Sequence, residues 1–211
     1  MRILVIAATK AEIEPFTGVN KNVEILITGV GVPSTIYLLQ KKLQQKETGL
    51  VIQAGIAGSF TEAINLGDVV LVKQDTFADI GMEEKEQFTS IFNTGFTDKD
   101  AFPFTDGWLI NLNDLLNHLP LRSVKGITVN KVSDSLVQKQ QFLKGFAPQV
   151  ESMEGAALHY VCLQENIPFI QIRSISNFIG ERDKSRWKLK SAIINLNEQL
   201  NKLTDKLLRQ Q

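Results

Sequence analysis

Six short apolar runs recur along the chain, and they constrain its fold more than any other feature of the sequence. They are rich in Val and Ile and show little polar alternation, which is typical of strands buried on both faces. Apolar residues at spacings of three and four predict helices at residues 33–46, 153–166 and 193–207. Strands that alternate with helices predict an α/β fold with a mostly parallel sheet. The predicted strands lie at residues 2–8, 23–28, 49–55, 68–73, 124–129 and 168–176.

Length and composition limit the class of protein. The chain has 211 residues, of which 43% are apolar and 22% are charged, which suffices for one sizeable core. We therefore expect a single domain over residues 1–211. Lys and Arg together number 23, as do Asp and Glu, so the chain lacks the basic excess that a nucleic-acid partner would need.

Location can also be predicted from the sequence. No run approaches the roughly 20 apolar residues that span a bilayer. The apolar start at Ile3–Ala8 is short and soon followed by charges, unlike a signal peptide. The one cysteine, Cys162, has no partner for an internal disulfide, which favours a reducing compartment. We expect a soluble, cytoplasmic protein that does not bind a membrane.

Two glycine-bearing segments follow predicted strands. Gly29 and Gly31 precede Pro33, a residue favoured in the first turn of a helix. They match the first two glycines of the G-x-G-x-x-G pattern of dinucleotide-binding proteins, but Ser34 occupies the position of the third glycine. A plain tight turn is therefore the simpler interpretation. The segment "QAGIAGS" around Gly55 is either a closely packed turn or a place where a ligand approaches the backbone.

Acids and an amide follow other predicted strands. Glu12, and Glu154 after Met153, stand near predicted helix starts, where the helix dipole alone would explain an acid. Ser176 and Asn177 end the strand "IQIRSISN", where either could cap the next helix. Taken singly, none of these residues identifies a site.

Other features point to structure or to loops. His118 and His159 lack metal-ligand spacing with the cysteine or the acids, so we expect both to be structural. Residues 79–106 are polar, dotted with aromatics and without a clear period, which predicts a long loop of the kind that often serves as a lid.

In chain order these pieces resemble the purine nucleoside phosphorylase and nucleosidase superfamily. They are an acid after the first strand, a Gly-x-Gly turn, an A-G-x-A-G segment, a Met-Glu helix start and R-S-I-S followed by an amide. The resemblance covers nearly the whole chain. It implies a three-layer α/β/α fold with a central mixed, mostly parallel sheet, and a homodimer or larger homo-oligomer.

Two segments carry a closer resemblance, to the futalosine hydrolases. They are "LGDVVLVKQDTFADIGMEE" and "RSISNFIGERDKSRW". Enzymes of that type remove hypoxanthine from futalosine, an inosine-type nucleoside with a carboxyphenyl-ketone extension at its 5′ end, in an alternative menaquinone pathway. The resemblance thus implies an N-glycosidase that uses neither a metal nor an organic cofactor.

The resemblance also implies roles for single residues. Glu12 matches the acid that holds and deprotonates the attacking water, a contribution of roughly 10²–10⁴-fold in rate. Glu154 matches the acid that binds the ribose hydroxyls and faces the developing positive charge. Met153 matches the residue that packs against the sugar, and Gly55 with Ile56 would approach the substrate through backbone.

Asn177 is the position expected to read the base, with Ser176 beside it as a substrate-binding residue. Adenine-specific nucleosidases carry aspartate there. An amide can donate to O6 of a 6-oxopurine and accept from N7–H, whereas an ionised aspartate would face O6 lone pair to lone pair. Asn177 therefore predicts hypoxanthine or guanine as the leaving base. An amide cannot supply the N7 proton, whose source the sequence leaves open.

Water is the expected nucleophile. The phosphorylases that the chain resembles bind phosphate with arginines and a serine, because guanidinium groups suit phosphate. Here the loop "AATKAEIEPF" has no arginine, Gln53 stands at another arginine position, and Ile56 stands at the serine position. An isoleucine side chain cannot donate to a phosphate oxygen.

Several alternatives stay open at this stage. The chain could be a methylthioadenosine/S-adenosylhomocysteine nucleosidase, a 6-oxopurine nucleoside phosphorylase, or a nucleoside-binding module without catalysis. The group that binds the 5′ carboxylate is also open. "GERDKSRW" offers cations and an aromatic ring, but a solvated loop explains it equally well; its relevant residues are Arg182, Lys184, Arg186 and Trp187.

Overall fold

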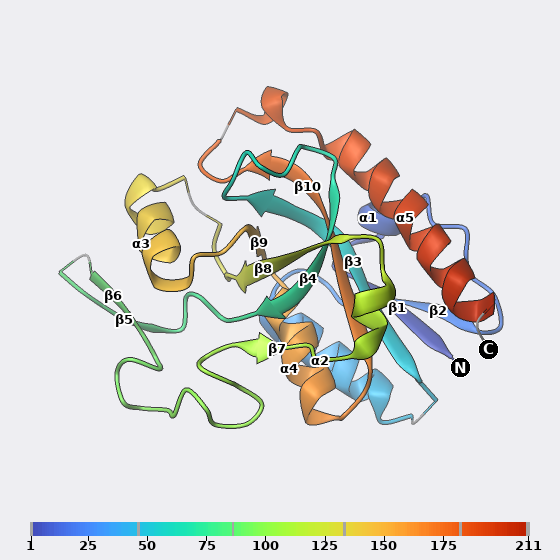
Figure 1. The fold of residues 1–211 in the computed structure, drawn as a ribbon, viewed down its shortest axis with the longest axis horizontal. Coiled ribbons are helices and arrows are strands. Elements are labelled where there is room, and N and C mark those ends of the chain that lie inside the picture. The colour runs from blue at the N-terminus through green and yellow to red at the C-terminus, as the bar shows by residue number, and fades with distance from the viewer. Residues whose placement is uncertain (1, 46, 86, 133, 182, 210–211) are drawn as a thin grey trace.

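The six predicted strands and three predicted helices are all present. The computed structural model describes residues 2–45, 47–85, 87–132, 134–181 and 183–209 (Figure 1). The strands are β1 (Ile3–Ala7), β2 (Val23–Ile27), β3 (Leu50–Ser59), β4 (Val69–Asp75), β8 (Arg122–Thr128) and β10 (Phe169–Phe178). The helices are α2 (Val32–Leu43), α4 (Gly155–Gln164) and α5 (Leu189–Arg209).

The strands form one mixed sheet. Its order is β10-β4-β8-β9-β3-β1-β2, where β9 is Val150–Ser152, and β7 (Leu109–Ile110) pairs with β4. Five pairings are parallel, and three, β10–β4, β3–β9 and β4–β7, are antiparallel. Because β10 also pairs with β3, strands β3, β10, β4, β8 and β9 close into a ring, from which β1 and β2 extend. The predicted mixed, mostly parallel sheet is confirmed.

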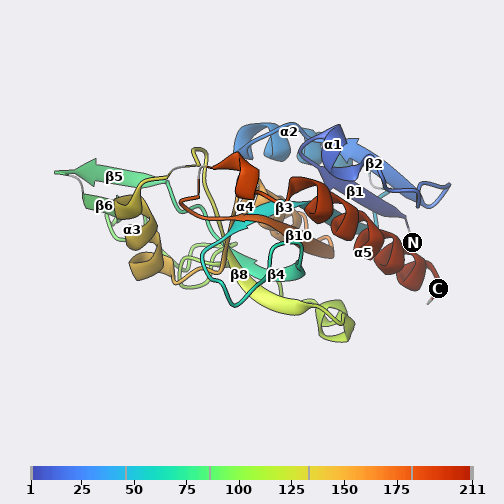
Figure 2. The same cartoon turned by 90° about the horizontal axis from the view of Figure 1, so that it is seen from above.

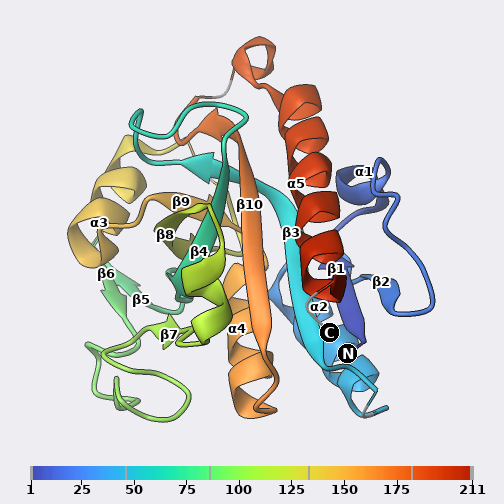
Figure 3. The ribbon, with the colours of Figure 1, turned by 45° about the vertical axis from the view of Figure 1, so that its right-hand side comes forward.

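Helices cover both faces of this sheet, which confirms the α/β class and the expected layers. Helix α5 and the short α1 (Lys10–Ile13) pack on one face, and Figure 3 shows α5 lying along β3. Helices α2 and α4 pack on the other face. A third apolar cluster joins strands of the ring and consists of Ala57, Ile64, Val70, Val72, Val124, Val150 and Ile175.

Two strands run further than the sequence indicates. β3 continues through Gly55 and Gly58, so the expected turn at "QAGIAGS" is wrong. β10 continues through Asn177 to Phe178, so Asn177 does not cap a helix. Glycine normally weakens a strand, but any larger side chain at Gly55 or Gly58 would meet Arg173 or Ile179, which cross close to the backbone.

The expected long loop at residues 79–106 contains a hairpin. Strands β5 (Gly81–Glu84) and β6 (Gln87–Ser90) form a separate two-stranded sheet. Figure 2 shows this hairpin and α3 (Leu136–Phe146), which was also not predicted, at the end of the molecule away from α5. The described residues also form two 3₁₀ turns, Asp114–His118 and Lys184–Arg186. None of the helices in the described ranges has the length and apolar content needed to cross a membrane.

Candidate active site

A cavity of about 460 Å³ opens where β1, β3 and β10 end. These three strands run parallel, so their carboxyl ends share one edge of the sheet, which is the usual ligand position in open α/β folds. Six of the seven predicted site residues line this cavity: Glu12, Ile56, Met153, Glu154, Ser176 and Asn177. Gly55 lies outside the lining.

Glu12 is fixed by its own helix and by β3. Thr9 caps α1 in a capping box, in which its N–H and hydroxyl donate to Glu12 Oε2 at 2.9 and 3.0 Å. The Ile56 N–H donates to Glu12 Oε1 at 3.2 Å. From α5, Asn197 Nδ2 donates to the Glu12 carbonyl at 2.8 Å. Glu12, which is 8% exposed as a residue, is therefore held with its carboxylate in one orientation at the cavity wall.

Glu154 is fixed by the glycine turn after β2. It is the N-cap residue of α4 and is buried. The Gly31 N–H donates to Glu154 Oε1 at 3.0 Å, and Gly31 adopts φ +92°, which favours glycine. Burial raises the pKa of Glu154, while Arg173 and the Gly31 N–H act in the opposite direction. The tight turn thus serves the site by presenting a donor to this acid.

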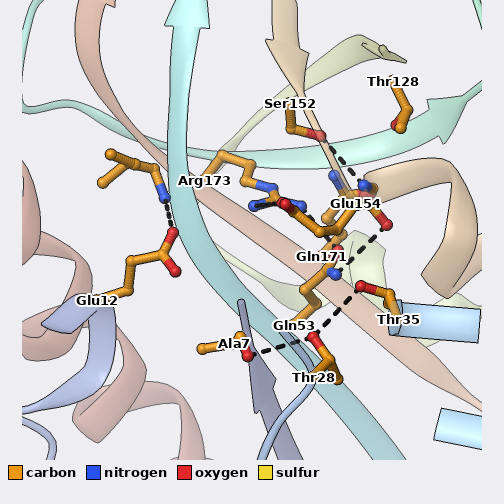
Figure 4. Close-up of polar contacts among 12 residues, drawn as sticks. Ala7, Glu12, Thr28, Thr35, Gln53, Thr128, Ser152, Glu154, Gln171 and Arg173 are labelled. Carbon is orange, nitrogen blue, oxygen red and sulfur yellow. Dashed lines mark hydrogen bonds and ion pairs between the residues drawn. The ribbon is translucent and has the colours of Figure 1, made fainter. Parts of the chain in front are cut away.

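Arg173 is a central residue of the site that the sequence analysis did not single out. It is 1% exposed in the middle of β10, and its Nη1 lies 3.6 Å from Glu154 Oε2 (Figure 4). Its Nη2 donates to Gln53 Oε1 at 2.9 Å. A Cβ at Gly55 would lie 2.3 Å from Arg173 Nη1, so the glycine makes room for the guanidinium. The sequence feature that could have identified this residue is an arginine inside the apolar run "IQIRSIS".

A second buried group supports the start of α4. Asp75 accepts hydrogen bonds from Thr128 Oγ1 at 2.9 Å and Gln171 Nε2 at 3.2 Å, and burial raises its pKa to about 6. Thr128 Oγ1 in turn accepts the Ala156 N–H at 2.7 Å. A Cβ at Gly155 would lie 2.2 Å from Asp75 Oδ2. This network fixes the first turn of α4 and hence Glu154.

A β-bulge sets the direction of Ser176 and Asn177. The register of β10 against β3 shifts between Ile175 and Asn177, so Ser176 is an extra residue. Side chains normally alternate between faces along a strand, but both Ser176 and Asn177 line the cavity because of the bulge. Ser176 Oγ donates to Asn177 Oδ1 at 2.8 Å, which orients the amide.

The charge of the lining is one-sided. Four glutamates contribute to it, Glu12, Glu151, Glu154 and Glu181, whereas the described lining contains no lysine, arginine or histidine. Such a wall suits a ligand that develops positive charge better than one that carries phosphate.

His159 is buried, its Nδ1 lies 2.9 Å from the Leu109 carbonyl oxygen, and burial lowers its pKa to about 4. Within the described residues, no group of three or more His, Cys, Asp or Glu could hold a metal ion.

In the loop after β10, Trp187 lines the cavity, while Arg186 is exposed and pairs with Glu181 at 2.9 Å. Arg182 lies outside the described residues.

The chain is similar to known proteins over most of its length. The family model described as the phosphorylase superfamily matches residues 5–209. A futalosine hydrolase of Thermus thermophilus is 26% identical over 181 residues, which are 84% of this chain and 79% of that protein. A 5′-methylthioadenosine/S-adenosylhomocysteine nucleosidase of Buchnera aphidicola is 25% identical over 210 residues, which are 93% and 84% of the two chains. Among solved structures, native futalosine hydrolase of Helicobacter pylori has a TM-score of 0.78 at 18% identity, with 97% of each chain covered.

Proposed function

Because the chain belongs to the phosphorylase superfamily, we propose that it is a purine nucleosidase that hydrolyses the N-glycosidic bond of futalosine and releases hypoxanthine, as a step of an alternative menaquinone pathway. The observation that carries the proposal is the joint presence of Glu12, Glu154 and Asn177 in the lining of one cavity.

Glu12 is the proposed base for the attacking water. Its two carboxylate oxygens are oriented by donors from Thr9 and Ile56, so one edge of the group is held toward the cavity. A base so fixed meets the geometric condition for general-base catalysis. Water attacks C1′ of the ribose and gives its proton to the Glu12 carboxylate as the oxygen–carbon bond forms.

Glu154 is the proposed electrostatic partner of the ribose. Its carboxylate accepts from the Gly31 N–H and lies near Arg173, so it is oriented before substrate arrives. A preorganised negative charge stabilises the positive charge that develops on an oxocarbenium-like ribose. Met153 lines the cavity beside it as the proposed packing partner of the sugar.

Asn177 is the proposed reader of the base. Its Oδ1 accepts from the Ser176 hydroxyl, and its Nδ2 donates to the Phe178 carbonyl at 3.2 Å, which leaves a second N–H available for O6 of hypoxanthine. The apolar lining that includes Trp187, Leu189 and Ile193 suits the aryl ring of the futalosine extension, whereas the described lining offers no cation for its carboxylate. We also propose a homo-oligomeric enzyme located in the cytoplasm.

Hydrolysis is favoured over phosphorolysis by two features of the site. The described lining carries no cationic side chain, and Gln53 is engaged with Arg173. We expect the purified protein to release hypoxanthine from futalosine at the same rate with and without inorganic phosphate. The sugar product should be the free ribosyl compound, identified by mass spectrometry. Strict dependence on phosphate, with a ribose-1-phosphate product, would contradict the proposal.

A methylthioadenosine/S-adenosylhomocysteine nucleosidase is the second candidate. Curated relatives of that name match the chain at similar identity. The specific observation against it is the amide at position 177, which lacks the carboxyl group suited to the exocyclic amine and N7 of adenine.

A further inference from the structure

A third buried glutamate, Glu151, lines the cavity, and the mechanism above does not use it. Glu151 lies in β9 and pairs with Gly58 of β3, while Asn177 of β10 pairs with the same Gly58 from the other side. Directly paired residues point to the same face of a sheet. An added Cβ at Gly58 would lie 3.4 Å from Asn177 Nδ2, so that face is the one on which the amide lies.

This pairing places the side chains of Glu151 and Asn177 on either side of Gly58, which has no side chain. Their Cα atoms are about 10 Å apart, which is two strand spacings. A 6-oxopurine carries O6 and N7 side by side on one edge. A base that turns this edge toward Gly58 and binds Asn177 through O6 would present N7 to the longer glutamate side chain. Ile179, which also lines the cavity, provides an apolar floor there, because its Cδ1 lies 2.3 Å from an added Gly58 Cβ.

Glu151 differs from the other two buried glutamates in its surroundings. The Ile56 N–H donates to Glu12, and the Gly31 N–H donates to Glu154. Glu151 is only 6% exposed, yet its carboxyl has no hydrogen-bond or ion-pair partner among the described residues. Its carboxyl opens to the cavity, where the ionised form lacks the protein donors that Glu12 and Glu154 have, so a protonated carboxylic acid costs less there. The site therefore favours the acid form of this residue.

The charge of Asp79 acts on the pKa of Glu151 in the same direction as burial. Asp79, from the connection between β4 and β5, and burial together raise the pKa of Glu151 to about 7, with burial the larger cause. The other titratable groups of the lining, Glu12, Glu154 and Glu181, are also acids. Lys139 of α3 donates to the Ile179 carbonyl at 2.9 Å rather than to Glu151.

We propose that Glu151 is the acid that protonates the leaving purine in the hydrolysis proposed above, on which this inference rests. The C1′–N9 bond breaks and its electron pair passes into the purine ring, while the carboxyl proton of Glu151 moves to N7. Water forms the new bond to C1′ and gives its proton to Glu12. Both carboxyl groups then return to their starting states by exchange with solvent, so atoms and charge balance.

The direct test is Glu151→Gln, with Glu198→Gln on the exposed face of α5 as the matched control. A glutamine of the same size cannot transfer a proton, so we expect kcat on futalosine to fall by about 10²-fold or more. On p-nitrophenyl riboside, whose leaving group departs as a stabilised phenolate without a proton, the same variant should keep a rate within a few-fold of wild type. Equal losses on both substrates would assign Glu151 a structural role and overturn the inference.

The pH profile gives an independent readout. The acid must carry its proton, so kcat of the wild type should fall as pH rises through about 7, and this limb should be absent from Glu151→Gln. Asp79→Asn removes a charge that raises the pKa of Glu151, so it should move the limb to lower pH even if Glu151→Gln fails to fold. An unmoved limb in Asp79→Asn would contradict the inference.

Failure of the inference is distinguishable from failure of the proposed function. Wild-type protein that releases hypoxanthine, combined with a fully active Glu151→Gln, refutes only the role of Glu151. Wild-type protein that releases no hypoxanthine from futalosine refutes the proposed function itself and the inference with it.

Discussion

Glu12→Gln is expected to reduce turnover of futalosine by at least about 10²-fold, while the affinity for the nucleoside stays within a few-fold of wild type. An amide cannot take a proton from water, and loss of a positioned general base costs roughly 10²–10⁴-fold in rate. The fold should tolerate the change, because glutamine serves as well as glutamate at the third position of a capping box. Hypoxanthine release measures turnover, and calorimetric titration of the slow variant measures binding.

The control for this experiment is again Glu198→Gln, which makes the same carboxylate-to-amide change on the solvent-exposed side of α5. It should leave both quantities unchanged. Unchanged turnover in Glu12→Gln would remove Glu12 from the mechanism. A loss of binding together with turnover would instead make it a substrate-binding residue.

Arg173→Met is expected to have the largest effect on stability of any substitution at the site. The guanidinium is buried between Glu154 and Gln53, and its removal leaves a buried carboxylate without its cation. Breaking a buried pair in this way costs about 3–5 kcal/mol. The loss of stability should appear as a lower midpoint of urea unfolding. Arg173→Lys keeps the positive charge but not the planar guanidinium with its two donor nitrogens, so it should lower stability less than Arg173→Met.

The matched control is Arg209→Met at the exposed end of α5, which should change stability by no more than about 0.5 kcal/mol. A second readout separates a role in the site from a purely structural one. Arg173 lowers the pKa of Glu154, so its removal should move the acidic limb of the activity profile to higher pH. A stability loss below about 1 kcal/mol would contradict the description of Arg173 as the central cation.

Periodicity sufficed to predict the six long strands and three of the helices, because each has a continuous apolar run or a clear apolar stripe. It failed for β7 and β9, which are short, and for α3, in which only Phe142 is buried, so that the helix has no clear apolar stripe. The ends of β3 and β10 were misjudged because glycine and asparagine usually end strands. Here contacts from Arg173 and Ile179 account for the glycines, and these contacts form only in the folded chain.

The candidate site could be predicted only in part for a similar reason. Each acid was visible, yet single residues near helix starts have an ordinary structural explanation. The groups that orient them were not predicted, because their partners lie far apart in the chain, as Gly31 and Glu154 do. Two signals were nevertheless readable: Arg173 inside an apolar strand, and Asn197 beside the apolar stripe of α5.

The central claim is that Asn177 makes the enzyme a 6-oxopurine nucleosidase. The most direct test is the ratio of kcat/KM for futalosine to that for its 6-amino analogue, which differs only at the atom that Asn177 would contact. We expect wild type to favour futalosine by about 10-fold or more, since a buried hydrogen-bond mismatch costs about 1–3 kcal/mol. Asn177→Asp should shift the ratio toward the 6-amino substrate by a similar factor. A wild-type preference for the 6-amino substrate, with adenine as the main released base, would contradict the account.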